Sequence, residues 1–426
     1  MKVQDPCLMA DQPTSWTVRV ARQLVIKSLS RLNNIQICVH DQDGTWLLGD
    51  PGAEVEQRFV VQLKEARLWR ELLLGGSLAV GEGYVQGHWR CEDLLGLLRA
   101  LAAQMEALQQ GLDHPLKRWL LPMQRLAHWV NRNTKTGSRR NIQAHYDLGN
   151  DFFRLFLDQQ HKMYSSAIYP HPEADLETAS TYKLEMIARK LDLQPEDHLL
   201  EIGTGWGGMA IYAAQHYGCK VTTTTISREQ YLHAQQKIAA AGLEDRIELL
   251  FEDYRDLTGQ YDKLVSIEMI EAVGHDFLPV YLKTLAARLK PEGLALIQAI
   301  TIRDQRYDQG VKRMDFIKKF IFPGGFLPSL TELSRQLTRH TPLNVINLDE
   351  IGLHYAQTLA DWRERFHAQL DQVRALGYDE HFIRMWTYYL VYCEAGFRER
   401  SIGTAQLLLA GPQNRAAAWN GGALMR

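Results

Sequence analysis

The sequence predicts an open, mostly parallel α/β sheet preceded by a smaller α+β domain. A chain of 426 residues is too long for one ordinary core, so two or three domains are expected. Residues 142–426 alternate strand and helix patterns, which is typical of a parallel sheet flanked by helices. Residues 1–110 mix short strand patterns with helical ones, and residues 111–141 form a basic connection between these two regions.

The strands of the larger region are bounded by clear helix and turn patterns. Between the last two of them, "KPEG" indicates a helix stop and a turn. Residues 303–380 then interrupt the alternation, and we expect them to form a helical insertion that covers the ligand crevice. The apolar helix at 381–400 is expected to be mainly core. The predicted strands are residues 198–203, 220–227, 246–253, 262–270 and 294–302.

Composition and charge indicate which partners, among nucleic acids, membranes and metals, the protein can be expected to bind. The formal net charge of −2 gives no reason to expect nucleic acid, and a membrane partner would need a local patch. The five cysteines are scattered without metal-binding spacing, so no metal is expected, and they fit a reducing compartment. No apolar run approaches the roughly 18 residues of a spanning helix. We therefore expect a cytoplasmic protein, at most peripheral to the inner face of the membrane.

A basic amphipathic pattern occupies residues 116–132. Apolar residues recur there at spacings of 4, 3 and 4, and arginines recur every seven residues along one flank: Trp119, Met123, Leu126 and Val130, with Arg118, Arg125 and Arg132. This pattern suits either an anionic lipid surface or an interdomain helix packed on the protein. Four cations near "FIFPGGF" (Lys312, Arg313, Lys318 and Lys319) form either a second lipid contact or a solvated face.

A glycine-rich loop, "EIGTGWGG" at residues 201–208, follows a predicted strand and opens a helix. Gly203 and Gly205 permit a tight turn, and Gly207 permits close packing of helix and strand. A ligand carboxylate or ribose can then meet free N–H groups at the helix N-terminus. The alternative is a structural turn without a ligand. The motif resembles the first motif of the class I S-adenosylmethionine-dependent methyltransferases.

That resemblance implies a set of cofactor-binding positions. Glu201 opens the motif, and Trp206 either stacks near the adenosine or wedges the start of the helix. The ribose-binding acid of that class is replaced by "TTTTIS", which leaves Thr225 and Gln230 as hydrogen-bonding groups. Asp253, followed by Tyr254, either accepts from the adenine amino group or caps the next turn.

Several further stretches, in order, make the chain similar to the cyclopropane fatty acid synthases nearly end to end. They are "GGSLAVGEGYVQGHW" (75–89), "HYDLGNDFF" (145–153), "MYSSAIY" (163–169), "DYRDL" (253–257), "EMIEAVG" (268–274), "FIKKFIFPGGFLPS" (316–329) and "YYLVYCEAGFR" (388–398). The resemblance implies transfer of a methylene group from S-adenosylmethionine onto the cis double bond of a phospholipid acyl chain. It also implies an N-terminal domain that engages lipid, and dimers among relatives imply a homodimer as one option.

The same resemblance implies that a bound bicarbonate removes a proton from a carbocation intermediate. Its expected ligands here are Glu271, Tyr355 and the main chain near Ile300. Ser166 stands where the family usually has Cys, and Gln298 stands where it usually has His. Both can still hydrogen-bond an anion. Plant-type members of the family also combine "EMIEAVGH" with this Gln.

Other residues near these motifs keep open roles. Tyr164 and Ser165 match positions that contact the cofactor in this family. Glu268 faces the sulfonium, braces Glu271 or caps the next helix, and His145 and Tyr146 either line the site or are structural. Two rivals to cyclopropane formation remain: an enzyme that makes methylene- or methyl-branched lipids, and a lipid-binding protein without catalysis.

Overall fold

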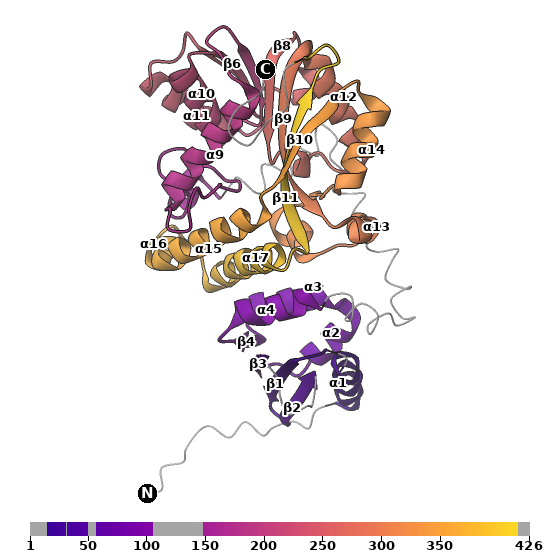
Figure 1. Ribbon diagram of the computed structural model, residues 1–426. Helices are drawn as coiled ribbons and strands as arrows, with labels where there is room; N and C mark the ends of the chain where they lie inside the picture. Colours follow the sequence, from indigo (N-terminus) through magenta and orange to yellow (C-terminus); the bar gives the residue numbers. More distant parts are fainter. Residues whose placement is uncertain (1–14, 31, 50–56, 105–147, 416–426) are drawn as a thin grey trace, which may run out of the picture. The chain divides into compact units, whose positions relative to one another are not determined.

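The structure is a computed structural model that describes residues 15–30, 32–49, 57–104 and 148–415 (Figure 1). The chain divides into two compact units, Met1–Trp119 and Leu120–Arg426, which are described separately. The predicted linker at 111–141, with its amphipathic pattern, lies outside the described residues, as do His145 and Tyr146.

The first unit is an α+β domain around a four-stranded sheet of order β2-β1-β3-β4. β1 runs parallel to β3 and antiparallel to β2, and β3 is antiparallel to β4. Gly83 permits a close approach within this unit, since a Cβ there would lie 2.6 Å from a Leu68 methyl group. Its elements are α1 (Trp16–Leu29), β1 (Ile35–Asp41), β2 (Gly44–Gly49), β3 (Gln57–Leu63), α2 (Leu68–Gly75), α3 (Ser77–Val85), β4 (Trp89–Cys91) and α4 (Leu94–Ala103).

The second unit alternates strands and helices as predicted. Its helices are α8 (Asn150–Arg154), α9 (Leu176–Leu191), α10 (Gly208–Tyr217), α11 (Arg228–Ala240), α12 (Leu278–Arg288), α13 (Tyr307–Lys312), α14 (Leu330–His340), α15 (Gly352–Ala368), α16 (Leu370–Ala375) and α17 (Glu380–Arg398). Short 3₁₀ turns lie at η2 (Tyr254–Asp256), η3 (Ile270–Ala272), η4 (His275–Phe277) and η5 (Asp304–Arg306), and η6 (Ile317–Ile321) is a π-helical turn. Its strands are β5 (His198–Ile202), β6 (Lys220–Thr224), β7 (Ile247–Leu250), β8 (Tyr261–Ile267), β9 (Leu289–Ile302), β10 (Asn344–Glu350) and β11 (Ile402–Ala410).

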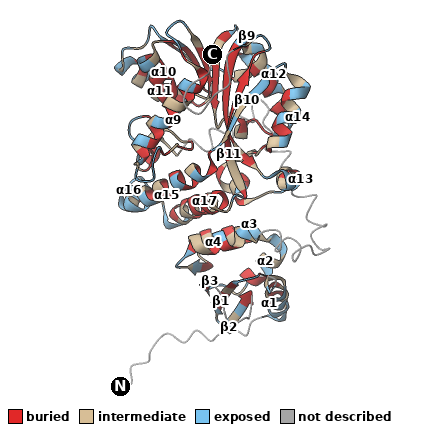
Figure 2. Cartoon of the chain, in the orientation of Figure 1, coloured by how far each residue is buried: buried red, intermediate tan, exposed pale blue. Residues whose placement is uncertain are grey.

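These strands form one sheet of order β10-β11-β9-β8-β5-β6-β7. β5 to β9 pair in parallel, and β11 runs antiparallel to both of its neighbours. One apolar cluster joins the sheet to α9 and α10, and another joins it to α12 and α14, so both faces are covered. The inner strands β11, β9, β8, β5 and β6 are accordingly buried along most of their length, whereas the edge strands β10 and β7 are not (Figure 2). The predicted mostly parallel sheet is confirmed, and it has the class I methyltransferase order.

The structure differs from the predicted elements at three places. The strand β11 lies at Ile402–Ala410, where no strand was predicted. The segment 303–380, expected to be helical, includes the edge strand β10. "KPEG" lies inside β9, where the residues between Leu289 and Leu294 bulge out opposite Asp262 of β8. A bulge adds residues to a strand without ending it, so the turn-forming residues of "KPEG" are accommodated inside β9. Helix α17 is largely buried, as expected.

Within the described ranges, no helix has both the length and the apolar content that crossing a membrane requires.

Candidate active site

The carboxylate of Glu268 gathers three distant segments of the chain. Its Oε1 accepts from the backbone N–H of Ser166 at 2.9 Å and from Nε2 of Gln298 at 2.8 Å. Its Oε2 accepts from the hydroxyl of Tyr355 at 2.8 Å. Glu268 directly follows β8 and has φ +51°, a left-handed conformation that is unusual for a residue other than Gly, Asn or Asp. The turn after the strand therefore directs this side chain toward three donors.

A buried chain of amides fixes the direction in which Gln298 donates. Lys190 can only donate, and its Nζ bonds Oε1 of Gln406 at 2.7 Å. Nε2 of Gln406 then donates to Oε1 of Gln298 at 2.9 Å. That leaves Nε2 of Gln298 to face Glu268. The exposed end of the chain is an ion pair between Lys190 and Asp349 at 2.5 Å.

Glu271 lies one turn further on, in η3, and has different partners. Its Oε1 accepts from the backbone N–H of Ile300 at 2.5 Å. Its Oε2 is buried and has no hydrogen-bond partner among the described residues. Burial, followed by the nearby charge of Glu268, raises the pKa of Glu271 to about 8. This carboxyl therefore favours a proton at neutral pH.

Burial also raises the pKa of Glu268, while the donors from Gln298 and Ser166, the Lys183 charge and the Tyr355 hydroxyl oppose that rise. Because Glu268 accepts three hydrogen bonds and Glu271 accepts one, Glu268 is the member of the pair that better holds a negative charge. Burial beside this charge raises the pKa of Tyr355 well above its ordinary value, so its hydroxyl stays a donor.

Aromatic side chains surround the Tyr355 end of this arrangement. The Tyr355 ring stacks on Phe397 at 4.5 Å and meets Trp362 edge-on at 6.0 Å. Trp362 in turn lies 5.2 Å from the ring of Tyr164, whose hydroxyl bonds that of Tyr389 at 3.0 Å. Helices α15 and α17 thus supply four of the five aromatic side chains packed beside the acid pair, and segment 163–169 supplies Tyr164. We refer to these five residues as the aromatic cluster.

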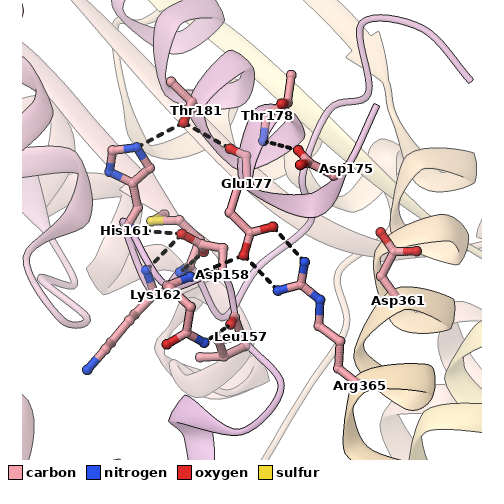
Figure 3. Close-up of polar contacts among 12 residues, drawn as sticks. Leu157, Asp158, His161, Lys162, Asp175, Glu177, Thr178, Thr181, Asp361 and Arg365 are labelled. Atoms are coloured by element: carbon pink, nitrogen blue, oxygen red, sulfur yellow. Dashed lines mark hydrogen bonds and ion pairs between the residues drawn. The ribbon is translucent and has the colours of Figure 1, made fainter. Parts of the chain in front are cut away.

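The segment 163–169 carries Tyr164, Ser165 and Ser166 and is fixed at both ends. At its start, buried Asp158 accepts three successive backbone N–H groups, those of residues 161–163, at 2.6 to 3.1 Å (Figure 3). At its end, the hydroxyl of Tyr169 donates to Asp361 of α15 at 2.7 Å. The middle of the segment is therefore held firmly enough to present the Ser166 N–H to Glu268.

A second set of contacts ties the helices around this segment together. Glu177 of α9 and Arg365 of α15 form a two-pronged ion pair at 2.6 and 2.8 Å (Figure 3). His161 bonds the hydroxyl of Thr181 on α9 at 3.0 Å. Lys183, also on α9, is buried and donates to Oγ of Ser165 at 2.7 Å. Burial lowers the pKa of Lys183 to about 8, opposed by nearby carboxylates that include Glu268.

The glycine loop passes directly against both parts of this site. Gly203, Gly205 and Gly207 all have positive φ, at 102°, 54° and 89°, which glycine adopts without strain. A Cβ on Gly203 would lie 3.3 Å from the side chain of Met269, next to Glu268. A Cβ on Gly208 would lie 2.7 Å from the His161 carbonyl. The loop, the acid pair and segment 163–169 therefore form one neighbourhood.

The other predicted cofactor-binding residues have definite partners. Glu201 is buried against the hydroxyl of Thr223, with its pKa raised by burial to about 8. The Thr225 hydroxyl donates to the amide oxygen of Gln230 at 3.0 Å. Trp206 packs on Phe153 and donates to Asn150, so it secures the loop to α8.

Asp253 caps η2 and forms an ion pair with Arg255 at 2.7 Å, which is the capping alternative raised above. Tyr254 packs edge-on against Tyr281, and burial raises its pKa to about 12.

The residues expected to hold bicarbonate do not fit that ion here. The hydroxyl of Tyr355, the amide of Gln298 and the N–H of Ser166 already bond Glu268, and the N–H of Ile300 already bonds Glu271. The Ser166 hydroxyl donates to the carbonyl of Ala167. The structure thus separates the predicted set into a larger group around Glu268 and a pair, Glu271 with Ile300.

Sequence reasoning did not identify Asp158, Lys183 or the central position of Glu268. For Glu268, an acid directly after a buried strand was a signal, but its three donors are 102, 30 and 87 residues away. The suggested cationic lipid contact needs one correction. Lys318 is buried, and its Nζ donates to the carbonyls of Gly310 and Arg313, so it does not face solvent with its neighbours.

Comparison with known proteins identifies the family. A family model described as mycolic acid cyclopropane synthetase matches residues 133–407, well over half of the chain. The chain belongs to the mycolic acid cyclopropane synthetase family. This synthetase-family protein is an S-adenosylmethionine-dependent methyltransferase, and the expected resemblance to cyclopropane fatty acid synthases is confirmed.

Named relatives of this synthetase-family protein include different lipid methyltransferases. It is 39% identical over 348 residues to tuberculostearic acid methyltransferase UfaA1 of Mycobacterium tuberculosis, covering 79% of this chain and 80% of the relative. It is 36% identical over 352 residues to cyclopropane-fatty-acyl-phospholipid synthase of Escherichia coli K12, covering 82% and 87%. The structure of mycolic acid cyclopropane synthase CmaA1 complexed with SAH and CTAB matches with TM-score 0.60 and 30% identity, covering 64% of this chain and 98% of that one.

Proposed function

We propose that this protein transfers a methylene group from S-adenosylmethionine to the cis double bond of a phospholipid acyl chain and closes a cyclopropane ring. The observation that carries the proposal is the meeting of three features: the glycine loop, a buried acid pair and the aromatic cluster. A methyl donor, a proton acceptor and an apolar lining are the parts that this chemistry needs.

The glycine loop and its surroundings fit the methyl donor. Gly205 has open space where a Cβ would be, so a ligand can approach the backbone at the turn. Thr225 and Gln230, joined side chain to side chain after β6, supply polar groups for ribose hydroxyls. When bound, S-adenosylmethionine supplies an electrophilic methyl group. The loop's contact with Met269 brings this site next to the acid pair.

The aromatic cluster suits the other reactant. Attack of an alkene on a methyl cation equivalent leaves positive charge on the acyl chain. Aromatic faces attract cations and exclude water, which would otherwise trap that charge as an alcohol. Tyr164, Trp362 and Tyr355 therefore both accommodate hydrocarbon and protect the cationic chain until a base removes a proton.

A second candidate product is a methyl- or methylene-branched chain, formed when the proton leaves the acyl chain itself. The similarity to tuberculostearic acid methyltransferase UfaA1 favours it, as do Ser166 and Gln298 at positions where Cys and His are usual. The similarity to the E. coli synthase favours the ring and a phospholipid substrate. We retain the ring as the proposed product, because plant-type members with the same Glu and Gln pattern belong to the cyclopropane synthase group.

A bilayer substrate requires the protein to reach a membrane surface. We propose that it acts peripherally on anionic phospholipid through the basic pattern at 116–132, which lies outside the described residues. Its arginines attract anionic head groups, and its tryptophans suit the interface.

Lipid analysis tests this function. The purified full-length protein is incubated with S-adenosylmethionine and oleoyl phospholipid vesicles, with or without phosphatidylglycerol, and the fatty acids are analysed by mass spectrometry and NMR. A gain of one CH₂ with ring-proton signals, faster on anionic vesicles, is expected. A gain of CH₂ with a double bond or a methyl branch would replace the ring by the second candidate. Cofactor binding without any lipid product would contradict both.

A further inference from the structure

We infer that the carboxylate of Glu268 is the built-in base of this enzyme and stands in for the bicarbonate that the family resemblance implies. The inference rests on the proposed function. It deepens that function by naming the group that collects the proton.

Three hydrogen-bond donors converge on Glu268 as they would on a small anion. The Ser166 N–H and the Gln298 amide bond one oxygen, and the Tyr355 hydroxyl bonds the other, all at 2.8 to 2.9 Å. A carboxylate and a bicarbonate ion present the same planar O–C–O group to such donors. The positions to which the resemblance assigned bicarbonate are therefore engaged by a side chain of the protein.

The polarity of the site requires an anion at this position. Lys190, acting through Gln406, turns the amide of Gln298 so that N–H points at Glu268. Buried Lys183 on α9 adds a positive charge that favours the ionised form of Glu268. Donors and charge thus hold a carboxylate, while burial raises its pKa and makes it a stronger base than an exposed Glu.

The backbone conformation of Glu268 is strained, as is common for residues at functional sites. Its φ of +51° is strained for a glutamate, and Gly would occupy it without strain. Its own N–H donates to the carbonyl of Gln298, which holds the turn in place. The chain therefore keeps a strained Glu where it delivers a carboxylate next to the glycine loop.

Methyl transfer and ring closure release one proton, which Glu268 accepts. The alkene electron pair forms a bond to the transferred methyl carbon as the sulfur–methyl bond breaks, which leaves a carbocation on the acyl chain and S-adenosylhomocysteine. An oxygen of Glu268 then takes one proton from that methyl group. The freed C–H electron pair forms the second carbon–carbon bond and closes the ring, and the protonated Glu268 releases its proton to water before the next turnover.

Two variants test this role, one that keeps the space between the three donors filled and one that empties it. Glu268→Gln fills the space but cannot accept the proton, and Glu268→Gly empties the space and suits the backbone. In CO₂-depleted buffer, both are expected to lose at least 100-fold in kcat. Added bicarbonate is expected to restore Glu268→Gly at least tenfold, and to leave the wild type, Glu268→Gln and the exposed control Glu292→Gln unchanged. A wild-type rate that rises with bicarbonate, or an active Glu268→Gln, would overturn the inference.

A binding measurement separates this inference from the proposed function. ¹³C-bicarbonate binding to S-adenosylhomocysteine-loaded protein is followed by NMR, which needs no turnover. Glu268→Gly is expected to bind the ion, and the wild type and Glu268→Gln are expected not to bind it. Binding by the wild type, or by none of the three, would overturn the inference even when lipid turnover is normal. If the wild type forms no lipid product yet this binding pattern holds, the proposed function is wrong, but Glu268 still occupies the anion-binding position.

Discussion

Glu268 and Glu271 are three residues apart, yet their surroundings give them different chemistry. Glu268 accepts three donors and lies near the Lys183 charge, whereas Glu271 accepts only the Ile300 N–H and leaves one buried oxygen without a described partner. Two nearby carboxyls of unequal environment tend to hold one proton between them. The geometry places that proton on Glu271.

Substitutions at Glu271 test this division. Glu271→Ala removes the acceptor of the Ile300 N–H and is expected to lower kcat roughly tenfold or more. The Kd for S-adenosylmethionine should change less than about threefold, because the Glu271 side chain bonds Ile300 and not the glycine loop. Glu271→Gln keeps a neutral group that can accept from the Ile300 N–H, so it should retain at least a third of the activity at pH 7.

The pH profile of kcat/KM provides the second measurement. Since the pKa of Glu271 is raised to about 8, wild-type activity should decline above pH 8, and Glu271→Gln should lack that decline. An inactive Glu271→Gln would mean that the ionised carboxylate is required. Loss of cofactor binding in Glu271→Ala would place this residue in the cofactor site.

At the scale of elements, the site depends on how α9, β9 and β11 align their side chains. Gln298 and Gln406 are opposite residues on the antiparallel strands β9 and β11, so their amides meet directly. Lys190, in the last turn of α9, reaches the outer amide and sets the direction of donation. Helix α9 thereby orients, through Gln406, the Gln298 amide that bonds Glu268.

Removing the charge at the end of this chain should therefore affect catalysis. Lys190→Met is expected to lower kcat roughly five- to twentyfold, since either amide can then turn and present oxygen to Glu268. KM should change little, and Lys220→Met at an exposed site should have no effect. A stopped-flow measurement of kcat beside a thermal unfolding curve distinguishes positioning from instability. Loss of kcat in proportion to unfolded protein would contradict the positioning role.

At the scale of the whole molecule, the second unit buries several ionisable groups between the sheet and its helices. Burial raises the pKa of Glu201 and of Glu271 from 4.5 to about 8, so the folded state favours their protonated forms. These two carboxyls should therefore lower the free energy of unfolding as the pH rises from about 4.5 through 8. Burial lowers the pKa of His161 and His233 from 6.5 to about 4, so these histidines have the opposite effect below about pH 6.5. Burial lowers the pKa of Lys183 from 10.5 to about 8, so its contribution has the opposite slope, between pH 8 and 10.5.

Urea unfolding at pH 5.5, 7 and 8.5 measures this dependence. The wild type is expected to lose more than about 1 kcal/mol of stability between pH 7 and 8.5, where histidines are mostly neutral in the folded and unfolded states. Glu201→Gln can still accept from Thr223 and should show a shallower decrease, whereas the exposed control Glu244→Gln should follow the wild type. Equal slopes in all three proteins would show that Glu201 is already ionised in the folded state.

The sequence by itself determined the sheet and the location of the glycine loop. Both depend on local patterns: apolar strands alternate with amphipathic helices, and glycines stand where φ must be positive. It also predicted most of the residues that the structure brings together around Glu268 and Glu271, because the motifs of the family mark them one by one. It missed two strands: β10, which is exposed at the sheet edge and lacks a continuous apolar run, and β11 (Ile402–Ala410), which follows the last helix.

Only the tertiary structure decided which residue is central. The partners of Glu268 come from before β5, from β9 and from α15, and no local pattern records such a meeting. The direction of an amide and the protonation of an acid depend on what is packed around them in low dielectric. Family motifs therefore predicted an anion site, and the structure shows the carboxylate of Glu268 among three of the donors predicted for that site.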